Sequence, residues 1–267
     1  MKDFQSLYEQ TIFYDCAKFI NNVMLSYSEI CTSMLHSLIE EEEEDGEEHD
    51  VFQMFRSITV QLEKIRLLVI PEVMRIFKEK TRFDYPLKKN AEDEVSMSID
   101  HVCALHAKYF FQVWTASLGE NMVPFGDVKW EEVGDLEQNF VTSLNRIVEF
   151  IDSLEIPQQL YNKTVYYLVE QLLVAAKEVG YRTVEDIKML NSFNFHWTVC
   201  SQFLAERLHK EALDKLSNGI RTLHKEICKE SYINESDCIS QDKMNEIVKK
   251  FLDEEGEEEE EEEGGYE

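Results

Sequence analysis

The side chains best suited to chemistry in this sequence are its histidines and cysteines. His101 and His106 are five residues apart, a spacing that does not place two imidazoles on one helix face to chelate a metal. His196 stands beside Trp197, where we interpret it as a packed or hydrogen-bonded histidine and not as a general base. These residues predict neither a metal site nor a catalytic histidine.

The cysteines show no CxxC pair and no spacing typical of metal ligands. Several fall on predicted apolar faces, where a free thiol behaves as a small hydrophobic group. The six are Cys16, Cys31, Cys103, Cys200, Cys228 and Cys238. Free thiols of this kind fit the reducing cytosol, and the first residues, "MKDFQSLYEQ", do not resemble a signal peptide. No apolar run approaches the roughly 18 residues that span a bilayer, so we expect a cytoplasmic, soluble protein.

Catalytic motifs are missing as well. The sequence has no glycine-rich phosphate loop, no HExxH, and no serine or cysteine in a nucleophile context. We therefore predict that the protein is not an enzyme and needs no cofactor. A helical enzyme with an unrecognised site is the alternative, and a buried cluster of ionisable groups lining a deep pocket would indicate it.

The charge of the chain is concentrated in two acidic runs. Residues 40–50 ("EEEEEDGEEHD") hold 9 acids and residues 253–267 hold 11, out of 54 acids in a chain of net charge −27. Such runs repel themselves and bury no apolar surface, so we expect a disordered loop and a disordered tail. The acidic balance argues against nucleic acid and against direct binding to an anionic membrane, but leaves basic protein surfaces as partners.

The elements that must position any functional surface are helices. The chain has only 9 Gly and 4 Pro in 267 residues, and its apolar residues recur every three or four positions. We predict an all-α fold, a stack of antiparallel hairpins with seven or eight helices. One domain spans residues 1–252, with a subdivision near 119–135. The first helix carries its apolar residues on one face: Phe19, Ile20, Val23, Met24, Tyr27, Ile30, Cys31, Met34, Leu35 and Leu38.

Prolines and glycines predict where helices stop. Two stripes of the same period flank Pro157, at residues 140–154 and 161–179, and predict a helical hairpin. Pro71 is expected to end or kink the second helix, since proline lacks the backbone donor. Gly180 is expected to close one helix, and a further break is expected near Gly219 or earlier. The sequence "TVED" at residues 183–186 predicts a helix start.

The stretch "SLNRIVEFIDSLEIPQQLYNKTVYYLVEQLLVAAKEVGYRTVEDIKML" resembles the C-terminal half of the zeste-white-ten family of vesicle-tether subunits. "FYDCAKFINNVMLSY", "VFQMFRSITVQLEKI" and "SQDKMNEIVKKFLDE" are similar to other helices of that family, so the resemblance covers most of residues 10–252. The long N-terminal coiled region of the family has no counterpart here. The resemblance implies a helical tether without catalytic residues. It would bind other tether subunits and SNARE proteins at the endoplasmic reticulum, and kinetochores are the alternative location.

The candidate partner-binding residues are acidic or lie beside acids. The family's acidic loop engages vesicle coat through tryptophans, which both acidic runs lack here, and only Trp130, in "DVKWEEVGDLE", has acidic surroundings. The acidic candidates are Glu40, Glu41, Glu42, Glu43, Glu44 and Asp45. The rival function is an acidic chaperone for basic clients such as histones, which would depend on the acidic runs and not on the helix faces. Neither function requires a metal or a cofactor.

Overall fold

A computed structural model describes residues 2–45, 48–118, 123–126, 128–130 and 132–263. Within these ranges the side chains of residues 2–8, 36, 38, 40–45, 48–50 and 254–263 are not described. The described residues form helices joined by turns, with no strand among them, so the predicted all-α fold is confirmed. No helix in the described ranges is long and apolar enough to cross a membrane.

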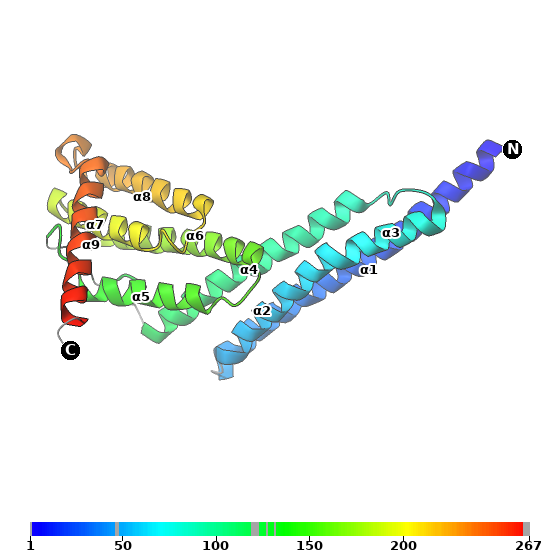
Figure 1. The fold of residues 1–267 in the computed structure, drawn as a ribbon, viewed down its shortest axis with the longest axis horizontal. Coiled ribbons are helices and arrows are strands. Elements are labelled where there is room, and N and C mark those ends of the chain that lie inside the picture. The colour runs from blue at the N-terminus through cyan, green and yellow to red at the C-terminus, as the bar shows by residue number, and fades with distance from the viewer. Residues whose placement is uncertain (1, 46–47, 119–122, 127, 131, 264–267) are drawn as a thin grey trace. The chain divides into compact units, whose positions relative to one another are not determined.

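The helices follow one another in chain order as labelled in Figure 1. They are α1 (Lys2–Asp45), α2 (Glu48–Lys64), α3 (Ile70–Thr81), α4 (Lys88–Leu118), α5 (Gln138–Ser153), α6 (Gln158–Thr183), α7 (Ile187–Phe203), α8 (Lys210–Glu230) and α9 (Gln241–Glu263). A π-helix, η1 (Ile65–Val69), joins α2 to α3, and a 3-10 turn, η2 (Glu235–Asp237), precedes α9.

The chain divides into two compact units. The first unit comprises residues 1–109 and 155–164, and the second comprises residues 110–154 and 165–267. The division falls inside α4, between Tyr109 and Phe110, and again inside α6, between Thr164 and Val165. Each unit has a core of its own and is described separately below.

The first unit contains a hairpin in which α2 packs beside the C-terminal part of α1 (Figure 1). Its core includes Leu35 of α1, Phe55 of α2 and Ile99 of α4, all almost fully buried. His106 of α4 stacks face to face on Phe55, with 4.8 Å between the ring centroids and 7° between the planes. An aromatic core of this kind accounts for Phe52 and Phe55 in α2 and for His106 and Tyr109 in α4.

Aromatic rings fill the core of the second unit. Phe125 lies between Trp114, Phe140 and Trp197, with centroid distances of 4.8 to 5.8 Å. The backbone of Phe125 has φ +61°, a left-handed conformation that is costly for a large side chain. Burial of the ring and a hydrogen bond from its N–H to Ser143 Oγ hold that conformation. The connection between α4 and α5 is thus anchored in the core at Phe125.

Pro157 and Pro71 each lie where α-helical hydrogen bonding is interrupted. Pro157 precedes α6, and its carbonyl accepts hydrogen bonds from the N–H groups of Leu160 and Tyr161, so α5 and α6 form two helices separated at this point. Pro71 lies in the first turn of α3, directly after the π-helix. The wider π turn accommodates a residue that cannot donate a backbone hydrogen bond.

Gly180 and Gly219 do not end helices, contrary to the prediction for Gly180. Both lie inside helices, α6 and α8, and the break before α8 comes earlier, between Phe203 and Lys210. A Cβ at Gly180 would lie 2.6 Å from Cδ1 of Ile227, and one at Gly219 would lie 2.5 Å from Leu173. These glycines are therefore sites of close helix approach.

Helix also extends into both acidic runs, where we expected a loop and a tail. α1 includes residues 40–45, α2 begins at Glu48, and α9 continues to Glu263. Glutamate is a good helix former, so a run of glutamates does not by itself stop a helix.

At the start of α7, the cap is Asp186, whose carboxylate accepts a hydrogen bond from Met189 N–H at 2.8 Å.

Candidate functional site

The first helix, α1, has two apolar faces. One is buried in the first unit and includes Ala17, Met24, Cys31 and Leu35. The other is exposed, and we call it the α1 stripe: Ile12, Cys16, Phe19, Val23, Tyr27, Ile30 and Met34. At about 100° per residue the two faces are separated by about 120° around the helix. The sequence pattern predicts a single face here, and the structure divides it.

The α1 stripe is a continuous apolar surface and not a set of scattered residues. Its members follow one another at intervals of four, three, four, four, three and four residues. The large side chains among them are 41% to 70% exposed, with Phe19 at the upper limit. From Ile12 to Met34 the stripe extends for about 33 Å along the helix axis. A contiguous exposed apolar surface of this size is typical of an interaction site.

An open groove lies beside the C-terminal half of the stripe. Ile30 and Met34 of α1 and Met54 of α2 provide its apolar lining, and Ser26, Ser33 and Ser37 provide short polar side chains. Short side chains allow a second helix to approach closely, because interaxial distance depends on the residues at the contact. Tyr27 at the edge of the stripe donates a hydrogen bond from its hydroxyl to Gln61 Oε1 of α2. That bond fixes the ring against α2.

The charges next to the stripe are mainly negative. Among the described side chains of α1, Glu9, Asp15 and Glu29 are acidic, Lys18 is basic, and all four are exposed. The sequence then continues into the acidic residues Glu40–Asp45, whose side chains lie outside the described residues. A cationic partner would be attracted to this surface and an anionic one repelled.

Trp130, the aromatic candidate for partner binding, lies in the core of the second unit. Its side chain is 4% exposed, and its indole N–H donates a hydrogen bond to Thr183 Oγ1 at 2.6 Å. The ring contacts Phe193 and His196 edge-on, at 5.3 and 5.0 Å. The indole therefore offers no surface to a partner, although the surrounding sequence is acidic.

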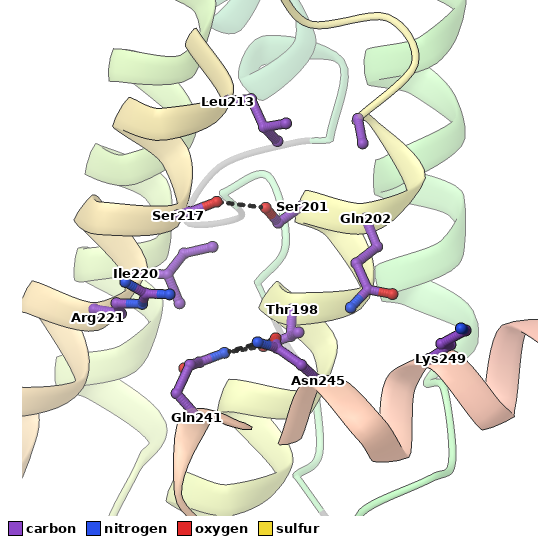
Figure 2. Close-up of a pocket in the computed structure, with 11 residues that line it drawn as sticks. Thr198, Ser201, Gln202, Leu213, Ser217, Ile220, Arg221, Gln241, Asn245 and Lys249 are labelled. Atoms are coloured by element: carbon purple, nitrogen blue, oxygen red, sulfur yellow. Dashed lines mark hydrogen bonds between the residues drawn. The ribbon is translucent and has the colours of Figure 1, made fainter. Parts of the chain in front are cut away.

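A second hollow, of about 400 Å³, lies in the second unit between α7, α8 and α9 (Figure 2). Ser201 and Ser217 share a hydrogen bond across it, and Gln241 Nε2 donates to Thr198 Oγ1 and to Asn245 Oδ1. Five of the polar side chains that line the hollow are thus hydrogen-bonded to one another. None of its described lining residues is acidic, and Arg221 and Lys249 supply positive charge.

Burial disfavours the charged forms of His106, His196 and Cys200. Burial lowers the pKa of His106 in the first unit to about 4, and it has the same effect on the pKa of His196 in the second. Burial raises the pKa of the Cys200 thiol to about 12. Desolvation disfavours the charged form in each case. His196 has a hydrogen bond on each nitrogen, Nδ1 to the carbonyl of Ser192 and Nε2 from the N–H of Glu137.

Comparison with known proteins finds no matching family model, curated protein or solved structure. The α1 stripe was missed in the sequence because its residues and the buried residues of α1 share one helical period. The available signal was the number of apolar positions, since the first helix holds more of them than one buried face accommodates.

Proposed function

We propose that this protein is a non-enzymatic helical scaffold whose α1 stripe binds an amphipathic helix of a partner protein. The observation that carries the proposal is the stripe itself, which is apolar, continuous and exposed on a helix whose other face is already buried. A helix that presents apolar residues at positions i, i+3, i+4 and i+7 fits such a surface. The length of the stripe corresponds to a partner helix of about 20 residues.

The charge next to the stripe indicates the chemistry of the partner. With Glu9, Asp15 and Glu29 against Lys18, and an acidic run after the stripe, the partner helix should carry lysine or arginine beside its apolar face. A second copy of this chain is a poor occupant, because each copy has a net charge of −27. Following the resemblance, helices of tether subunits and SNARE proteins at the endoplasmic reticulum are the first partners to test.

Cys16 offers a native position for identifying the partner. Its thiol is exposed on the α1 stripe, whereas Cys31, Cys103, Cys200 and Cys228 are buried and Cys238 is partly buried. A photo-crosslinker attached to Cys16 in the full chain, in cell extract, should capture a peptide that mass spectrometry identifies as a basic amphipathic helix. The matched control is Cys16→Ser, which removes the attachment point and should lose the crosslink.

The energetic test is the double substitution Val23→Glu with Ile30→Glu. Burying two such side chains stabilises a complex by about 3 kcal/mol, so the dissociation constant of the captured partner should rise at least about 100-fold. Val174→Glu, on α6 and similarly exposed at 60%, is the control and should bind normally. If binding survives the stripe substitutions but is lost when residues 40–50 and 253–267 are deleted, the protein is instead an acidic chaperone of basic clients.

A further inference from the structure

Three potential metal ligands meet at the C-terminal end of α8. They are His224 and Cys228, one helical turn apart on α8, and Cys238, which directly follows η2. Their ligand atoms all lie within 4.8 Å of one another, and His224 Nε2 lies 3.7 Å from Cys228 Sγ. All three residues belong to the second unit, far along the chain from the α1 stripe.

The separation of His224 from Cys228 matches the one that a zinc ion requires. Tetrahedral Zn²⁺ has Zn–S bonds of about 2.3 Å and Zn–N bonds of about 2.0–2.1 Å, which place sulfur about 3.6 Å from nitrogen and about 3.8 Å from a second sulfur. The His224–Cys228 distance of 3.7 Å is close to the first value without any rearrangement. Imidazole and thiolate are the ligand types that zinc prefers over magnesium or calcium.

The turn after α8 holds Cys238 near the helix. Ile233 N–H donates to the carbonyl of Cys228 at 2.8 Å, and Tyr232 takes a left-handed φ of +55°, so the chain reverses directly after α8. After the cysteine, Ile239 N–H donates to Asn191 Oδ1 of α7 at 2.9 Å. Cys238 is therefore fixed from both sides by hydrogen bonds that do not involve its thiol.

Asn194 of α7 supports the orientation of the imidazole. Its side-chain amide contacts His224 Nδ1, and it is 3% exposed, yet its Oδ1 has no hydrogen-bond partner in the described structure. With the amide turned by 180°, Oδ1 accepts a hydrogen bond from Nδ1–H of the imidazole. The tautomer with hydrogen on Nδ1 leaves the lone pair of Nε2 directed at the two thiols. An outer partner of this kind is usual for histidines that bind zinc.

We propose that His224, Cys228 and Cys238 bind one Zn²⁺ ion, with a water molecule as the fourth ligand. Binding replaces the two thiol protons with two Zn–S bonds and releases both protons to solvent, without any oxidation or reduction. The ion would join the end of α8 to the segment that leads into α9, so its role is structural.

The test is a metal titration of the full chain, reduced with a phosphine and stripped of metal with a chelator. Co²⁺ is the first probe, because a tetrahedral cobalt–thiolate complex absorbs in the visible and near ultraviolet. We expect one equivalent of Co²⁺ to produce that spectrum and one equivalent of Zn²⁺ to abolish it. Zn²⁺ should also raise the melting temperature that is measured by circular dichroism.

Cys238→Ser and His224→Gln are the informative variants, since both side chains are only partly buried. Each should weaken Zn²⁺ binding at least about tenfold, because removal of even a residue that hydrogen-bonds to a ligand has an effect of that size. Cys16→Ser should bind Zn²⁺ like the wild type. Metal bound without the thiolate spectrum, through the acidic runs, would overturn the proposal. Equal affinity in Cys238→Ser would overturn it too.

Discussion

The pH dependence of stability in the second unit should be governed by His196. This imidazole is 1% exposed, its Nδ1–H donates to the carbonyl of Ser192, and its Nε2 accepts from the N–H of Glu137. A second proton on the imidazole has to bind Nε2. There it would face the N–H of Glu137, and the hydrogen bond between Nε2 and that N–H would be lost. Burial lowers the pKa to about 4, against about 6.5 in an unfolded chain.

The sign follows from proton counting. Because the folded pKa lies below the unfolded one, the unfolded chain binds more protons between pH 6.5 and 4, so stability falls as the pH falls through that window. The contribution of His196 is fully present above pH 6.5 and is lost completely only below pH 4. Between pH 7.5 and pH 5.5 the expected loss is about 1.3 kcal/mol. The lower limit stays above the pI of 4.6.

The comparison that isolates His196 is wild type against His196→Gln, which keeps one donor and one acceptor but does not titrate. Urea unfolding followed by tryptophan fluorescence reports on this unit, because Trp114, Trp130 and Trp197 all belong to it. Wild type should lose about 1.3 kcal/mol more than the variant between the two pH values. If the two proteins differ by less than about 0.5 kcal/mol in this loss, the reasoning is refuted.

Three further substitutions probe the packing of the second unit by urea unfolding. Gly180→Ala should lower the free energy of unfolding by about 1–2 kcal/mol, because overpacking against Ile227 exceeds the gain in helix propensity. The second substitution Ile227→Val should restore part of that loss. If Gly180→Ala causes no loss, the close approach of Gly180 to Ile227 is contradicted. Asp186→Ala should cost about 1 kcal/mol and Asp186→Asn very little, since Asn also caps; equal losses would exclude a capping role. Trp130→Phe should cost about 1 kcal/mol through its lost bond to Thr183 and leave partner binding unchanged, whereas loss of binding would return Trp130 to the partner surface.

The helical fold could be predicted from the sequence because helix period and proline position are local properties. Pro157 separates α5 from α6 as expected, and Pro71 interrupts α-helical hydrogen bonding at η1. Gly180 was assigned a local role as a helix end, but its role depends on Ile227, a residue 47 positions away that approaches it in space. The low number of glycines predicted a helical fold, but the sequence did not show why each glycine occupies its position.

The two surface features could not be predicted in the same way. Ile30 and Leu35 both fit the apolar period of α1, and nothing in the sequence says that Leu35 is buried while Ile30 is 57% exposed. His224 and Cys228 have the spacing of one helical turn, which could have been noticed. Their meeting with Cys238 depends on the path of the turn after α8, which sequence spacing does not specify.

The division of the chain determines how it can be dissected experimentally. Residues 155–164 belong to the first unit but follow α5 of the second, so no single cut yields two intact pieces. A fragment that ends at Tyr109 would lack Leu160, which is 1% exposed and whose carbonyl faces the Cys103 thiol. Recombinant production of the first unit alone therefore calls for residues 155–164 to be grafted on or supplied as a peptide. Truncations placed at loops would leave part of the core of the first unit uncovered.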